Sequence, residues 1–161
     1  MKKLLLGIAA VCLAGFTFAQ DAPLWMRHSV ISPDGTTIAF TYKGDIYTVP
    51  VAGGRAMQIT TNPAYDTAPV WSPDSKRIAF ASDRMGSLDV YIVAKDGGEP
   101  RRLTTHSGSE TPLAFTDAGH VLFSAGIMPS AEAVVFPFNG QFNQVYRVSV
   151  EGGRPTMISS M

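Results

Sequence analysis

Two segments of the sequence are similar enough to each other to indicate the fold. Residues 31–40 read ISPDGTTIAF, and residues 71–80, forty positions later, read WSPDSKRIAF. Residues 45–60 and 89–104 match at a spacing of 44, because both contain Asp-x-Tyr, then a Gly-Gly pair and a final Thr. A chain that repeats at about 40–45 residues folds as a series of similar units, each packed on its neighbours.

A third and weaker copy follows. Residues 115–123 read FTDAGHVLF, and Tyr146, the Gly152-Gly153 pair and Ile158 continue the pattern. The distance from Tyr91 to Tyr146 is 55 residues, eleven more than the spacing in the earlier units. The third unit therefore carries an insertion between Ser124 and Gln144.

Each unit has turn residues where a four-stranded antiparallel sheet needs them. Ser-Pro-Asp-Gly places Pro and Asp at β-turn positions that suit them, and the Gly-Gly pair can adopt the positive φ of a tight hairpin. The runs between these turns are short and rich in Ile, Val, Phe and Tyr, which is typical of strands. The sequence predicts three blades, over about residues 26–61, 66–105 and 110–161.

A four-stranded repeat of this length is typical of a β-propeller, so the predicted class is all-β. A β-sandwich also has short strands at regular spacing, but it does not require the same turn and the same aromatic residue in every repeat. Hydrophobic alternation in the strands is imperfect, which fits sheets that are buried on both faces. We therefore expect Tyr47, Tyr91 and Tyr146 to pack between blades rather than to bind a ligand.

Residues 1–19 are predicted to be a secretory signal peptide. Lys2 and Lys3 precede an apolar run over residues 4–16, and small residues stand at the −3 and −1 positions of a cleavage site after Ala19. The run is shorter than the roughly 20 residues that a membrane-spanning helix needs. The sequence thus predicts an exported chain over residues 20–161, periplasmic or extracellular, with no membrane span.

The composition excludes some partners and supports one globular domain. Lys and Arg number 13 and Asp and Glu number 13, so the balanced charge gives no sign of nucleic-acid binding. The single cysteine, Cys12, lies in the signal segment, so the exported chain has no disulfide and depends on burial for its stability. With 45% hydrophobic residues the chain can form a core.

No catalytic, cofactor-binding or metal-binding residues are identified. His28, His106 and His120 lack the spacing of zinc ligands, so we interpret them as loop or surface residues. Residues 83–89 have an acid at each end, but Arg84 and Met85 stand where a calcium loop needs oxygen ligands. Residues 107–109 form a Ser-Gly-Ser loop without a nucleophile elbow, and no glycine-rich loop for a nucleotide is present.

The insertion over residues 124–144 is the one irregular feature. It contains Met128, Phe136, Phe138 and Phe142, which form too large an apolar group to remain in water without a partner. We expect it to fold over the edge of the propeller or to pack on a neighbouring part. The alternative is that it lines a passage for peptides.

The repeat, Ser-Pro-Asp-x-x-x-Ile-Ala-Phe followed by Asp-x-Tyr, Gly-Gly and a final Thr, resembles that of the Tol-system periplasmic protein and of tricorn-type proteases. Three further segments, residues 23–27 (PLWMR), 42–51 (YKGDIYTVPV) and 63–66 (PAYD), are closer to the amino-terminal propeller of secreted bacterial tricorn-type serine peptidases. The resemblance covers nearly the whole exported chain. Its motifs are specific for the fold and much less so for an activity.

The resemblance implies a six-bladed propeller at the front of a longer enzyme, of which this chain would hold three blades. The catalytic Ser and His of the family would then lie outside these residues, and the propeller would act as a scaffold or gate for peptides. The missing blades could be supplied by self-association. An alternative is a freestanding periplasmic module that binds protein partners.

Overall fold

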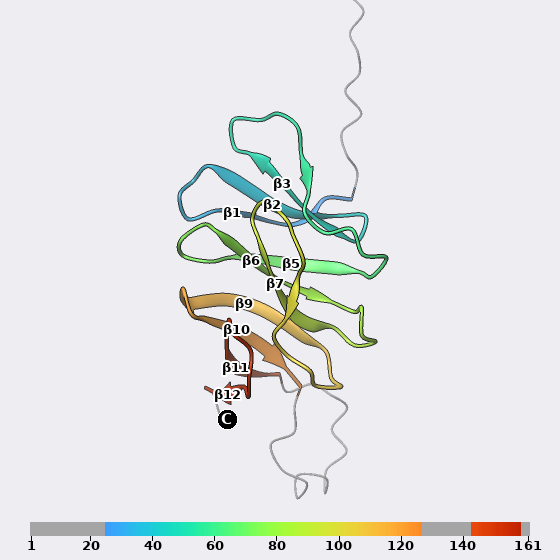
Figure 1. Cartoon of the computed structure of the whole chain (residues 1–161), viewed down its shortest axis with the longest axis vertical. Helices are drawn as coiled ribbons and strands as arrows, with labels where there is room; N and C mark the ends of the chain where they lie inside the picture. Colours follow the sequence, from blue (N-terminus) through green and yellow to red (C-terminus); the bar gives the residue numbers. More distant parts are fainter. Residues whose placement is uncertain (1–24, 127–142, 159–161) are drawn as a thin grey trace, which may run out of the picture.

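The computed structural model describes residues 25–126 and 143–158, and all the regular structure in these residues is β-strand (Figure 1). The strands form three antiparallel sheets of four strands each, in which neighbours in the sequence are neighbours in the sheet. The first sheet contains β1 (Arg27–Ile31), β2 (Thr37–Tyr42), β3 (Asp45–Pro50) and β4 (Met57–Gln58). The second contains β5 (Asp66–Trp71), β6 (Arg77–Ser82), β7 (Asp89–Ala94) and β8 (Arg101–Arg102). The third contains β9 (Glu110–Asp117), β10 (His120–Ala125), β11 (Gln144–Ser149) and β12 (Thr156–Met157).

The sheets are stacked in chain order, with the second between the other two (Figure 1). One apolar cluster joins the first and second sheets, and its buried members are Ala39, Ile46, Ile59, Trp71, Ile78, Phe80, Tyr91 and Val93. Another joins the second and third sheets, and its buried members are Ala79, Val90, Ile92, Leu103, Val121, Phe123, Ala125, Tyr146, Val148 and Val150. Three sheets in one series are propeller blades, so the propeller prediction is confirmed and the two-sheet sandwich is excluded.

The second sheet shows why hydrophobic alternation in the sequence is imperfect. Five of the six residues in β6 and five of the six in β7 are buried. Neighbouring residues such as Phe80 and Ala79 point to opposite faces of the sheet, and each lies in a different cluster. Tyr91 and Tyr146 are also buried between sheets, as predicted, whereas Tyr47 stacks on Phe40 at the face of the first sheet turned away from the second.

The Ser-Pro-Asp turns close the first hairpin of the first two blades by the same set of hydrogen bonds. Ser32 Oγ donates to Asp34 Oδ1 at 2.6 Å, and the Thr36 N–H donates to the same carboxylate oxygen at 2.9 Å. The Ser72–Asp74 pair repeats the first bond at 2.5 Å.

Ser75 in the second turn has a φ of +56°, and Gly35 at the same position of the first turn has a φ of +72°. A residue with a Cβ is strained there, by roughly 1–2 kcal/mol. The Ser75 hydroxyl accepts a hydrogen bond from the Asp34 N–H of the neighbouring blade at 3.1 Å.

The Gly-Gly pairs adopt positive φ in all three blades, with values between +85° and +127°. They lie within six-residue connections, 51–56, 95–100 and 150–155, rather than in two-residue hairpins. The fourth strand of each blade is correspondingly short, with two residues. The sequence therefore predicted the backbone conformation of these glycines correctly and the tightness of the turn wrongly.

Each blade is tied to the next where the new first strand begins. The Asp66 N–H donates to the Gly44 carbonyl of the first blade at 2.7 Å. The Glu110 N–H donates to the Leu88 carbonyl of the second blade at the same distance. The two pairs stand 44 residues apart in the sequence, so the repeat includes the junction between blades as well as the blade itself.

Trp71 fixes the packing of the first two sheets. Its indole Nε1–H donates to the Val30 carbonyl of β1 at 3.2 Å, and the residue is 8% exposed. Ile31 occupies the equivalent position at the end of β1 and is 57% exposed. The same position is therefore an anchor where a preceding sheet is present and an exposed apolar residue where none is described.

Two sequence predictions lie outside the described residues. They are the signal segment 1–19 and most of the insertion 124–144, whose residues 127–142 are not described. The start of that interval was predicted to be insertion but belongs to β10, which continues to Ala125. Within the described residues, nothing forms a helix long and apolar enough to cross a membrane.

Substitution of Trp71 tests the anchoring role. We expect Trp71→Phe to lower the free energy of unfolding by about 1–3 kcal/mol, because it removes a buried hydrogen bond and leaves a space between two sheets. Trp25→Phe is the matched control and should change stability by less than about 0.5 kcal/mol, since Trp25 is 71% exposed. Urea denaturation followed by circular dichroism measures both. Equal losses in the two variants would contradict the anchoring role.

Candidate functional site

The three histidines lie in separate places, each with a local partner. His28 Nδ1 is 3.1 Å from the Thr67 hydroxyl, and His106 Nδ1 accepts from the Gly108 N–H at 2.9 Å. His120 Nδ1 is 3.1 Å from a carboxylate oxygen of Asp117. No group of three or more potential ligands that could hold a metal ion occurs among residues 25–126 and 143–158.

The acids of the 83–89 loop face different partners. Asp83 Oδ1 accepts a hydrogen bond from the Tyr65 N–H at 2.8 Å. Asp89 is fully buried, and its Oδ2 lies 2.8 Å from Nη2 of Arg102. The loop therefore connects two neighbouring strands and joins the second blade to the segment that enters it.

Buried or half-buried acids recur at the end of the molecule where the first strand of each sheet begins, which we call the rim. At the junction of the first two blades, Asp45 accepts from Gln58 Nε2 at 3.0 Å, and Asp66 is fully buried. Arg84 places its Nη2 3.1 and 3.2 Å from the two oxygens of Asp66. The guanidinium of Arg84 also lies 4.5 Å from the centre of the Tyr91 ring.

The next junction has the same positions but a different arrangement of charge. Asp89 and Glu110 correspond to Asp45 and Asp66, and Arg102 replaces Gln58 and pairs with Asp89. Glu110 is fully buried, and neither of its oxygens makes a well-formed hydrogen bond. Burial raises the pKa of the Glu110 carboxyl to about 7, and the Asp89 carboxylate adds to this effect, while Thr104 and Arg102 oppose it.

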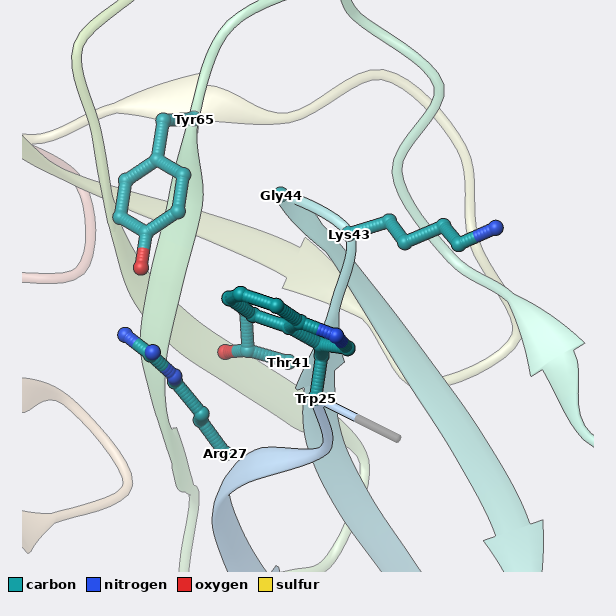
Figure 2. A pocket seen from close by; sticks show the side chains of 6 residues that line it. All are labelled: Trp25, Arg27, Thr41, Lys43, Gly44 and Tyr65. Carbon is teal, nitrogen blue, oxygen red and sulfur yellow. The ribbon is translucent and has the colours of Figure 1, made fainter. Parts of the chain in front are cut away.

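A pocket of about 360 Å³ opens at the rim of the first blade (Figure 2). We call it the rim pocket, and it is lined by Trp25, Arg27, Thr41, Lys43, Gly44 and Tyr65. Trp25 is central in the view, and the Arg27 guanidinium and Tyr65 hydroxyl point toward one another beside it (Figure 2). The Lys43 side chain extends away from Trp25 (Figure 2). The pocket thus combines two aromatic rings with one inward-facing cation.

Two polar groups of the rim pocket, the Thr41 hydroxyl and the Arg27 guanidinium, are available to a ligand. Thr41 is 2% exposed, and its hydroxyl has no hydrogen-bond partner in the described structure. The Arg27 guanidinium lies 5.8 Å from the centre of the Trp25 ring and forms no ion pair with the described residues. No carboxylate lines the pocket among the residues described.

Sequence reasoning identified neither the buried acids of the rim nor the rim pocket. The spacing of 44 that relates Asp45 to Asp89 and Asp66 to Glu110 was a usable signal for the acids. For the pocket, the signal was the three segments that carry the closer family resemblance, 23–27, 42–51 and 63–66, because they contain five of its six lining residues. Trp25 and Tyr65 are forty residues apart in the sequence, and only the pairing of β1 with β2 brings Arg27 opposite Thr41.

The fold and repeats define a β-propeller domain, and comparisons with known proteins identify its kind. Residues 23–160 match the family described as the tricorn protease N-terminal beta propeller domain. The chain belongs to this family.

Related proteins agree with this assignment. The tricorn protease homolog 1 of Streptomyces coelicolor is 35% identical over 102 residues, which are 63% of this chain and 9% of that protein. The uncharacterized peptidase YuxL of Bacillus subtilis is 30% identical over 129 residues, which are 79% of this chain and 20% of that protein. The chain therefore spans only a small part of these relatives.

A solved structure shows the same fold. The crystal structure of TolB from Acinetobacter baumannii superposes with a TM-score of 0.66 at 21% identity, and the match covers 84% of this chain and 32% of that chain.

The buried Glu110 generates a prediction about pH. The pKa of Glu110 is higher in the folded chain than the ordinary 4.5, so the folded chain binds this proton more tightly than the unfolded chain does. The stability that this protonation contributes is complete below about pH 4.5 and is lost as the pH rises through about 7. Ionisation in the folded state therefore costs up to about 3 kcal/mol at pH 8. We expect the change in unfolding free energy caused by Glu110→Gln to be more favourable to the folded state at pH 8 than at pH 5, because the variant has no carboxyl to ionise. Urea denaturation at both pH values measures the difference.

The matched control for this experiment is Glu99→Gln, because Glu99 is exposed in a loop of the second blade. Its effect on stability should be the same at pH 5 and pH 8. If Glu110→Gln shows no more pH dependence than Glu99→Gln, then Glu110 does not titrate as its burial indicates.

Proposed function

We propose that this chain is a non-catalytic propeller portion of a longer tricorn-type serine peptidase, in which it acts as a scaffold or gate for peptides. Membership of the propeller family and the similarity to two peptidases that are much longer than this chain support the proposal. In this view peptide hydrolysis depends on residues outside the blades described. The propeller acts as a rigid scaffold that limits which peptides reach those hydrolytic residues.

The face of the first sheet that is turned away from the second sheet is the observation that carries the scaffold role, although Phe40 on this face is only 6% exposed. Phe40 and Tyr47 lie on the face away from the second sheet, with their ring centres 5.8 Å apart. The equivalent Phe80 and Tyr91, 6.0 Å apart, are buried against the first sheet. Ile31 is 57% exposed where the equivalent Trp71 is buried. The face therefore has the aromatic pair of an inter-blade surface.

We propose that another blade of the same repeat covers this face, since the existing junctions use the same positions. Propellers typically have four to eight blades, and the family resemblance implies six. The covering blade belongs to the same polypeptide or to a second copy of this chain arranged head to tail. In both cases the contact buries Ile31.

Export is a further part of the proposal. The charged start, the short apolar run and the small residues before Gln20 indicate that residues 1–19 are a signal peptide. Residues 20–161 then act in the periplasm or outside the cell, with blades over about residues 26–61, 66–105 and 110–161.

The second candidate is a freestanding periplasmic propeller module that binds protein partners. The likeness to the solved TolB structure favours it, although at 21% identity this likeness reflects the fold. The DNA that follows the codon for Met161 separates the two candidates. A continuing frame with more repeats and a Ser-bearing domain supports the peptidase, and an immediate stop supports the module.

Exposed Ile31, on the sheet face that no described blade covers, predicts self-association of the isolated chain. We expect multi-angle light scattering to show dimers or larger species at micromolar concentration. Ile31→Glu should weaken the association at least tenfold, because it places a charge in a contact that otherwise buries an apolar side chain.

Met85→Glu is the matched control for this substitution, since Met85 is 64% exposed in a loop of the second blade. It should associate like the unaltered chain. A monodisperse, cooperatively folding monomer at micromolar concentration would show that the exposed face needs no covering blade.

The export proposal predicts cleavage after Ala19. Mass spectrometry of the exported protein should give a mature amino terminus at Gln20, and Ala19→Glu should block processing because the −1 position requires a small residue. Ala22→Glu, which lies beyond the cleavage site, should be processed normally. Exported protein that still begins at Met1 would contradict the assignment.

A further inference from the structure

We propose that the rim pocket binds a small carboxylic acid with an apolar or aromatic body. In the bound state the carboxylate meets the Arg27 guanidinium and the Thr41 hydroxyl, and the apolar body lies against Trp25 and Tyr65. The proposal goes beyond the scaffold role and does not depend on it. It rests on the unpartnered donors and the exposed rings of this pocket, and on a described lining that contains no carboxylate.

The unpartnered donors indicate a ligand that accepts hydrogen bonds. A buried hydroxyl without a hydrogen bond is costly in a folded protein, and Thr41 Oγ1 is such a group. In Figure 2 this hydroxyl points to the same side of Trp25 as the Arg27 guanidinium. A carboxylate placed there would accept from both groups, and its bond with Arg27 would be charge-assisted.

The acids at the junction of the first two blades are engaged by other groups, and none of them lines the rim pocket. Arg84 Nη2 donates to both carboxylate oxygens of Asp66, and Gln58 Nε2 donates to the Asp45 carboxylate. Asp83 accepts from the backbone N–H of Tyr65. The positive charge of Arg27 therefore remains available to a ligand, which explains why we infer an anion rather than a cation.

The walls of the rim pocket fit an apolar body. Trp25 is 71% exposed and Tyr65 is 42% exposed, so a ligand between them would remove aromatic surface from water. The volume of about 360 Å³ is at the lower end of the range of about 300–1,000 Å³ for ligand pockets. A small molecule such as an aryl or branched acid fits this space.

Calorimetric titration of the full chain with phenylacetate tests the proposal. The neutral amide of the same shape, phenylacetamide, is the comparison ligand. We expect the acid to bind at least tenfold more tightly than the amide, because the amide lacks the charge that pairs with Arg27. Arg27→Gln should weaken binding of the acid at least tenfold and leave binding of the amide unchanged.

Two further variants separate the pocket from general effects. Arg55→Gln removes an exposed cation outside the rim pocket and should bind phenylacetate like the unaltered chain. Thr41→Val should weaken binding severalfold, with thermal melting as the check that it folds. Equal affinity for acid and amide, an unchanged affinity in Arg27→Gln, or no heat of binding at all would overturn the proposal. The comparison of the two ligands uses the unaltered chain, so it stands even if a variant does not fold.

Discussion

Face-to-face packing of the sheets is the constraint on which the rest of the structure depends. The second sheet is apolar on both faces, so it would expose a large apolar surface if it stood alone, and packing between its two neighbours removes that surface from water. This requirement explains why Phe80 and Ala79, adjacent in the sequence, enter different apolar clusters. It also places acids where they have little access to water, so that Asp66 and Asp89 each lie against an arginine.

The sequence predicts the blades well because their turns depend on local chemistry. The Asp34 and Asp74 carboxylates bond backbone groups two residues away, and the Gly-Gly pairs adopt positive φ, whatever lies around them. The length of the Gly-Gly connections was harder to predict. Their first residues look like a continuing strand, but the ladder to the short fourth strand starts only at Met57 and Arg101.

The sequence singled out the segments that hold most of the candidate site but not their meeting, because these residues come together only through long-range packing. In the sequence, Thr41 looks like an ordinary strand threonine. That it lies beside Arg27 and Tyr65 in a pocket becomes apparent only from the pairing of β1 with β2 and from the position of Tyr65. Glu110 likewise looks like a solvated residue after a polar loop. Its burial results from the hydrogen bond between its N–H and the Leu88 carbonyl, which places the start of β9 against the second blade.

Comparison of the two junctions shows how one repeat can carry different electrostatics. Each junction has two acids and one arginine, but the arginine comes from a different strand or loop. At the first junction Arg84 neutralises Asp66 of the incoming blade, so the neutral Gln58 is sufficient beside Asp45. At the second junction Arg102 neutralises Asp89 of the outgoing blade, and the acid of the incoming blade, Glu110, has no ion pair among the described residues. Burial is the main cause of the raised pKa of Glu110, and the neighbouring Asp89 carboxylate adds to it, while the arginine at this junction offsets the effect only in part because it pairs with Asp89.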